Sequence, residues 1–149
     1  MKIAVYTVMV ALVVIADGCA KTWQAARFPD QSVLLENPQK ARLYLICGTP
    51  LGTALNDPVN DGNDYVGTIG PKSFLCWERD PGNTTIYVNP HGKWTNSCKV
   101  SMNVQRGNVY YIQLHTIPGF MVPIYAMDVM DMDKGKRLLG RCNPAKNAK

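Results

Sequence analysis

The chain has few of the residues from which catalytic sites are commonly built. Only two histidines occur among its 149 residues, His91 and His115. It contains no Gly-x-Ser-x-Gly, no His-Glu-x-x-His and no phosphate-binding loop. A set of serine or cysteine with histidine therefore has no support from the sequence. We expect a protein that is not an enzyme and that uses no cofactor.

The sequence also contains no recognisable metal-binding motif. The cysteines form no Cys-x-x-Cys pair, and their wide spacing fits no compact zinc site. Asp57, Asp61 and Asp64 are spaced four and then three residues apart. That spacing differs from the ligand positions of an EF-hand calcium loop. We therefore expect no bound metal.

The apolar run at the start of the chain is too short to cross a bilayer. Ile3–Ala16 is an uncharged stretch of fourteen residues after Lys2, whereas a spanning helix needs about 20 apolar residues. A basic start, a short apolar run and small residues after it are typical of an export signal. The predicted divisions are a signal peptide at 1–18, a lipidated N-terminus and tether at 19–39, a β domain at 40–142 and a C-terminal tail at 143–149.

Cys19 directly follows Ala16-Asp17-Gly18, a segment that resembles the lipobox of bacterial lipoproteins. The resemblance implies cleavage before Cys19 and a diacylglycerol on its thiol. Ordinary cleavage at the same bond followed by secretion is one alternative, and an uncleaved anchor is the other. The next residue is Ala20 and not aspartate, which implies sorting to the outer membrane, facing the periplasm. Several acyl chains would hold the protein there stably.

The number of cysteines agrees with this interpretation. The chain has five, and an odd count in an exported protein needs an explanation. Lipidation of Cys19 leaves Cys47, Cys76, Cys98 and Cys142, which can form two disulfides in an oxidising compartment. Four buried thiols are the alternative. Three pairings are possible, and Cys76–Cys98 with Cys47–Cys142 is preferred because the first pair flanks one predicted strand.

The formal net charge of +5 comes mostly from scattered lysines and arginines. Lys134-Gly135-Lys136-Arg137 is the one local cluster, which we interpret as a solvated turn. Contact with anionic lipid or a cell-wall polymer is the alternative interpretation. No nucleic-acid motif is visible, so we expect no nucleic-acid partner.

From residue 41 onward the sequence alternates between apolar and polar residues, which predicts β-strands. The predicted strands are 41–47, 64–69, 73–78, 84–88, 98–104, 109–114 and 124–130. We expect loops or turns between them, including 49–63 and 133–136, and a frayed tail after residue 142. No segment after the signal has a convincing helical period. The pattern predicts an all-β, antiparallel β-sandwich or a small barrel.

The strand 98–104 has the clearest alternation in the chain. It and the strand 109–114 are expected to pair as a hairpin across a short polar turn. Four residues of these strands are predicted to be buried: Val100, Met102, Tyr110 and Ile112.

The order of four sequence features resembles a known family. They are Ala41, Leu43, Tyr44 and Leu45 in an early strand; the Pro81-Gly82 turn before Thr84–Val88; Gly107, Tyr110, Tyr111 and Ile112; and a closing strand within 117–130. Over residues 40–140 this order is similar to the bacterial lipoproteins of the domain of unknown function 2846 type. The resemblance implies an immunoglobulin-like or carboxypeptidase-regulatory-like sandwich, and the family has no agreed activity.

These observations favour a non-enzymatic envelope lipoprotein that contacts a protein or a cell-wall polymer. Lys93 and Trp94 lie in a predicted loop, where an exposed aromatic ring beside a cation could form the contact. An inhibitor of the periplasmic lysozyme-inhibitor type is the alternative. The positive charge of the chain argues against it, because such lysozymes are themselves basic.

Overall fold

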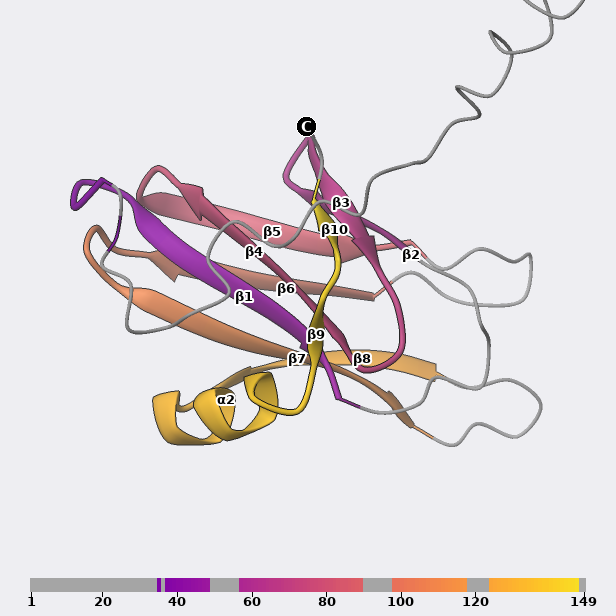
Figure 1. Ribbon diagram of the computed structural model, residues 1–149. Helices are drawn as coiled ribbons and strands as arrows, with labels where there is room; N and C mark the ends of the chain where they lie inside the picture. The colour runs from indigo at the N-terminus through magenta and orange to yellow at the C-terminus, as the bar shows by residue number, and fades with distance from the viewer. Residues whose placement is uncertain (1–34, 36, 49–56, 90–97, 118–123, 148–149) are drawn as a thin grey trace, which may run out of the picture.

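The computed structural model describes residues 35, 37–48, 57–89, 98–117 and 124–147. They form a β-sandwich with one short helix, which confirms the all-β prediction (Figure 1). The elements are β1 (Ala41–Cys47), β2 (Asp57–Asp61), β3 (Asp64–Ile69), β4 (Ser73–Arg79), β5 (Gly82–Val88), β6 (Cys98–Val104), β7 (Val109–Ile117), β8 (Ile124–Met130), α2 (Met132–Leu139), β9 (Asn143–Pro144) and β10 (Lys146–Asn147).

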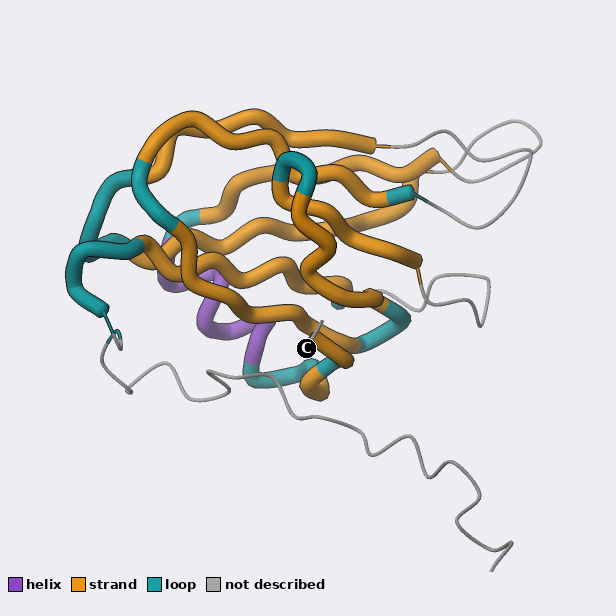
Figure 2. The backbone as a smooth tube through the Cα atoms, turned by 90° about the horizontal axis from the view of Figure 1, so that it is seen from above, coloured by secondary structure: helices purple, strands orange, loops and turns teal. Residues whose placement is uncertain are grey.

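The strands form two sheets that pack face to face (Figure 2). Sheet A has the order β8-β7-β1-β4-β9, and sheet B has the order β10-β3-β2-β5-β6. Most neighbours are antiparallel, as predicted. Two pairs in sheet A, β1 with β7 and β4 with β9, are parallel.

The predicted hairpin between β6 and β7 is wrong. β6 pairs with β5 in sheet B, whereas β7 pairs with β1 and β8 in sheet A. Each strand has an apolar face, and that face points into the core between the two sheets. The turn between them therefore connects the two layers and does not close a hairpin.

Strand β2 was predicted as part of a loop, because Asp57–Asp61 is rich in polar residues. Its burial nevertheless alternates, with Val59 completely buried between two inward-facing aspartates. Pro58 is tolerated because pairing with β5 begins only at Val59. The carbonyl of Pro58 accepts a hydrogen bond from the backbone amide of Asn89 at 3.1 Å.

The main core lies between the sheets. Its fully buried members include Leu43, Leu45, Val59, Ile69, Leu75, Ile86, Val88, Ile112 and Leu114. The prediction for Ile112 is confirmed. The other three residues predicted to be buried are only half-buried, and they pack against the edge of this core: Val100, Met102 and Tyr110. The prediction of full burial is therefore wrong for them.

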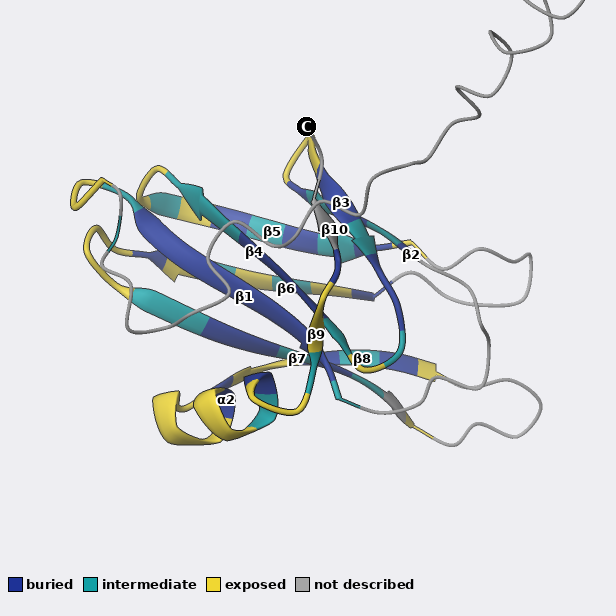
Figure 3. Ribbon diagram, viewed as in Figure 1, coloured by how far each residue is buried: buried dark blue, intermediate teal, exposed yellow. Residues whose placement is uncertain are grey.

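Strand β1 is buried on both faces (Figure 3). On the outer face of sheet A, Tyr44 and Ile46 pack with Phe74, Tyr111 and Met130 beneath helix α2. The rings of Tyr44 and Tyr111 stack with their centroids 5.3 Å apart. Burial, followed by the charge of Cys76 and a hydrogen bond with its thiol, raises the pKa of Tyr44.

Helix α2 occupies the segment that was predicted as a polar turn. Asp131 caps it by accepting a hydrogen bond from the amide of Lys134 at 2.8 Å. Gly135 lies against the ring of Tyr111, where a Cβ atom would come within 2.3 Å of that side chain. The basic residues lie on the exposed side of the helix. The sequence pattern concealed the helix because only Gly135 and Leu139 of its residues are buried.

The segment after residue 142 is not frayed within the described residues. Asn143–Pro144 pairs with β4, and Lys146–Asn147 pairs with β3 in the other sheet. Ala145 between them is buried, and its amide donates to the carbonyl of Phe74 at 2.7 Å. The segment therefore joins the edges of the two sheets.

None of the four described cysteines forms a disulfide, so the expected bridges are absent from the structure. In each preferred pair, the two cysteines also belong to clusters on opposite faces of sheet A. Cys47 and Cys98 belong to the core between the sheets, whereas Cys76 and Cys142 pack in the cluster beneath α2. Burial, and then the charge of Asp57, raises the pKa of the Cys98 thiol to about 11.

Candidate functional site: a polar hollow beside β4 and sheet B

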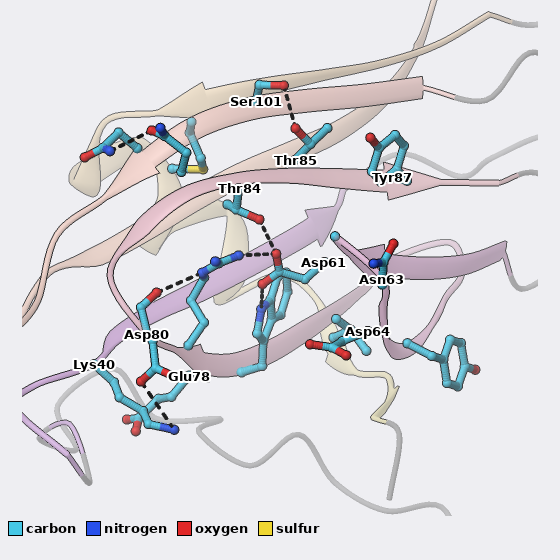
Figure 4. Close-up of a pocket in the computed structure, with 18 of the residues that line it drawn as sticks. Lys40, Asp61, Asn63, Asp64, Glu78, Asp80, Thr84, Thr85, Tyr87 and Ser101 are labelled. Atoms are coloured by element: carbon cyan, nitrogen blue, oxygen red, sulfur yellow. Dashed lines mark hydrogen bonds and ion pairs between the residues drawn. The ribbon is translucent and has the colours of Figure 1, made fainter.

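A hollow of about 1480 Å³ lies where β4 faces the β2–β3 turn and β5, with further lining from β6 (Figure 4). Both faces of β5 contribute to it, since Thr84 and Thr85 are both in its lining. Its inner part contains charged side chains. Its outer part contains mainly neutral polar residues and tyrosines, with the exposed Asp64 beside Tyr65.

Asp61 is the centre of the inner part, and its side chain is 7% exposed. Its carboxylate accepts hydrogen bonds from Trp77 Nε1 at 2.9 Å, from Arg79 Nη1 and from Thr84 Oγ1. Figure 4 shows Thr84 and Asp61 pointing toward each other from β5 and β2. These bonds connect β2, β4 and β5 across the end of the sandwich. Three donors also offset the cost of burying the carboxylate.

Two further ion pairs lie along the same side of the molecule. Arg42 Nη2 is 3.1 Å from Glu78 Oε1, and both side chains are nearly buried. Lys40 and Asp80 form a longer pair of 3.9 Å at the surface. Within the hollow, Asp61 therefore pairs with Arg79, and Glu78 in its lining pairs with Arg42. We infer that this part of the hollow holds the strands in position.

The outer part of the hollow follows β5 and β6. Thr85 and Ser101 are joined through their hydroxyl groups at 2.8 Å. Asn103 donates to the side-chain oxygen of Asn83 at 2.7 Å. Tyr87 lies on the same face of β5 as Thr85 and is half-buried. This part offers hydroxyl and amide groups and an aromatic ring with little charge.

Two turns determine where these strands lie. Gly62 has a φ of 61°, which favours glycine, and its amide donates to the carbonyl of Thr85 at 2.9 Å. Gly82, which follows Pro81, has a φ of 132°, which also favours glycine. The first turn holds the β2–β3 hairpin against β5, and the second carries the chain from sheet A to sheet B.

No family model and no curated protein matches this chain. The resemblance to the domain of unknown function 2846 family stays a prediction. The fold and the hollow are therefore described from the structure of this chain alone.

The residues nominated from sequence for lipidation and for partner contact lie outside the described residues. They are Cys19, Lys93 and Trp94, and His91 lies there too. His115 lies in β7, where its Nδ1 is 3.6 Å from Asp128 Oδ2 on the neighbouring strand. The described part of the chain has no group of three or more His, Cys, Asp or Glu side chains placed to hold a metal ion. No helix in that part is long and apolar enough to cross a membrane.

Sequence reasoning missed every side chain of the Asp61 network. Trp77 is half-buried and donates a hydrogen bond from its indole nitrogen to Asp61. Asp61 was considered only as a calcium ligand. The buried carboxylate could have been found from the alternation of Asp57, Val59 and Asp61, because this alternation places an acidic residue on an inward face.

Proposed function

We propose that this chain is a non-enzymatic envelope lipoprotein whose β domain contacts a protein or a cell-wall polymer from a lipid anchor at Cys19. The observation that supports it most is the contrast between the two parts of the hollow. The carboxylate of Asp61 is engaged by three donors, whereas the outer part exposes mainly neutral hydrogen-bonding groups. A surface of that kind suits binding.

The state of Asp61 and Glu78, the two least exposed carboxylates in the lining of the hollow, supports binding over acid–base chemistry. General acid–base catalysis needs a side chain within reach of the substrate that can donate or accept a proton. Asp61 already accepts from Trp77, Arg79 and Thr84, and Glu78 is paired with Arg42. Exposing either carboxylate to a substrate would require these interactions to be broken, at the cost of leaving buried donors without a partner.

The anchor is proposed from the sequence around Cys19. The first described strand begins at Ala41. The segment 19–39 would then connect the lipid to the domain, on the periplasmic side of the outer membrane. Secretion without the lipid is the alternative location.

Membrane fractionation of the full chain tests the anchor. The Cys19→Ser variant should move from the membrane fraction to the soluble fraction and should lose incorporation of labelled palmitate. Cys142→Ser is the matched control, because it removes a half-buried thiol from the folded domain, and it should stay on the membrane. A Cys19→Ser variant that remains on the membrane, with no palmitate on the unmodified protein, would contradict the proposal.

Retention of the soluble Cys19→Ser chain on purified envelope material tests the binding function. We expect saturable retention on cell-wall sacculi or on an envelope protein captured by crosslinking. Release of soluble fragments from the wall on incubation would instead indicate an enzyme. Trp94→Ala in the same assay tests the contact predicted from the sequence, and it should weaken retention without lowering the melting temperature.

A further inference from the structure

A row of side chains crosses four strands on the outer face of sheet B. In the register of the sheet, Asn60 on β2 is opposite Tyr65 on β3 and also opposite Tyr87 on β5, and Tyr87 is opposite Lys99 on β6. Residues paired in this way lie on the same face of a sheet. Tyr65 is 51% exposed, and Tyr87 and Asn60 are half-buried. The row therefore presents two tyrosines separated by an amide.

The spacing of the two tyrosines follows from the sheet. They are two strands apart, which corresponds to about 9–10 Å between their backbones. This is about the length of a disaccharide unit in an extended glycan. Aromatic rings offer flat apolar faces on which the C–H faces of sugars can stack.

The neighbouring rows provide hydrogen-bonding groups with fixed positions. Thr85 and Ser101 form one cross-strand pair at 2.8 Å, and Asn83 and Asn103 form another at 2.7 Å. Each pair uses part of its hydrogen-bonding capacity and keeps further donors and acceptors for a ligand. Because the pairs hold the side chains in place, less conformational freedom is lost when a ligand binds.

The charge of this face favours a neutral ligand. Lys99 is the one charged side chain in the three rows, although the whole chain has a net charge of +5. A polyanion would find few partners there. A protein interface would need a desolvated apolar centre, and these rows consist of hydroxyl, amide and phenol groups.

We propose that a neutral glycan chain binds across sheet B, with sugar rings on Tyr65 and Tyr87 and with Asn60, Thr85 and Ser101 as hydrogen-bonding partners. The proposal rests on the proposed envelope-binding function and narrows it to carbohydrate. The glycan runs perpendicular to the strands, along the row.

Titration of the full-length Cys19→Ser protein with tetra-N-acetylchitotetraose, followed by calorimetry and NMR, tests the site. Cellotetraose is the second probe, and it lacks acetamido groups. We expect saturable binding of at least one of them, with a Kd of about 1 mM or lower. The shifted amide signals should come from β2, β3, β5 and β6.

Three variants connect binding to the row. Tyr87→Ala should weaken binding about tenfold, and Tyr65→Ala by a similar factor, because each loses a stacking surface. Tyr87→Phe should bind within about threefold of the unmodified site, because it keeps the ring. Val129→Ala is the matched control, since it removes an exposed side chain from β8 in the other sheet. It should bind normally.

Two results would overturn the proposal. One is that neither tetrasaccharide binds at about 10 mM. The other is that a tetrasaccharide binds equally well to Tyr87→Ala and Tyr65→Ala variants whose melting curves show them to be folded. If the proposed envelope-binding function itself is wrong, the chain will be retained neither on sacculi nor on any envelope protein. Retention by an envelope protein without tetrasaccharide binding would leave the broader function standing and reject the glycan.

Discussion

The outer face of sheet A carries an apolar cluster beneath helix α2, whereas the outer face of sheet B is polar and supports no helix among the described residues. Tyr44 and Tyr87 illustrate the difference. Tyr44 is completely buried, stacked on Tyr111 beneath α2, and Tyr87 is half-buried beside Lys99. The same residue type thus has a packing role on one sheet and a surface role on the other.

This difference shows how the sandwich separates stability from contact. A buried aromatic side chain contributes through area removed from water and close packing. An exposed one contributes little to stability, and its apolar area remains for a ligand. The two outer faces can therefore be tested independently, because substitutions on one should leave the other intact.

The largest expected effect comes from exchanging the two tyrosines for alanine. Tyr44→Ala should lower the free energy of unfolding by about 3–5 kcal/mol, because it empties the centre of the cluster beneath α2. Tyr87→Ala should cost less than about 1 kcal/mol, since its ring is partly in water already. Urea denaturation of both variants measures the comparison. Equal losses would mean that the two faces do not differ in the way described.

The Asp61 network gives the next effect. Asp61→Ala should cost about 2–3 kcal/mol, because it leaves Arg79, Trp77 and Thr84 without their acceptor in a mostly buried position. Asp64→Ala is the control three residues along, where the carboxylate is exposed, and should change stability by about 0.5 kcal/mol or less. A thermal or urea melt that ranks the two variants equally would count against the network.

The burial of Cys98 between the two sheets should make the free energy of unfolding depend on pH. The pKa of the Cys98 thiol is raised from 9.0 to about 11 in the folded protein, mainly by burial. The contribution of the buried Cys98 thiol to the free energy of unfolding is therefore fully present below pH 9 and is lost as the pH rises through about 11. The loss should amount to about 2 kcal/mol by that point.

Cys98→Ala isolates this contribution, because other groups titrate equally in both proteins. The difference in unfolding free energy between the unmodified protein and the variant, measured at pH 8, 9, 10 and about 11, should shrink as the pH rises. A difference that stays constant over this range would contradict the raised pKa.

The smallest effect tests the close approach of α2 to sheet A. Gly135→Ala places a Cβ atom against Tyr111, so we expect a net loss of about 1 kcal/mol despite the better helix propensity of alanine. Gly140→Ala is the control. Its added Cβ would have no neighbour closer than 3.7 Å, and its φ of −63° suits any residue. That variant should be as stable as the unmodified protein or slightly more so, by thermal melting.

Most of the strands could be predicted because each has a local signal. Cys98–Val104 and Ile124–Met130 have the predicted bounds, since alternation along a strand reports which side faces the core. Strand β2 and helix α2 were missed because their local composition is that of a loop. The contacts that stabilise them, Asp61 with Trp77 and Gly135 with Tyr111, join residues far apart in the chain.

Runs of neighbouring residues were enough to predict the fold class, the positions of seven strands and an export signal with a lipid-modified Cys19. The folded structure was needed to find which strands pair, that β6 and β7 belong to different sheets, and that Tyr65 and Tyr87 lie in one row. Strand pairing depends on which faces can be buried together across the whole domain. That balance is a property of all the strands at once, so no single segment of the sequence contains it.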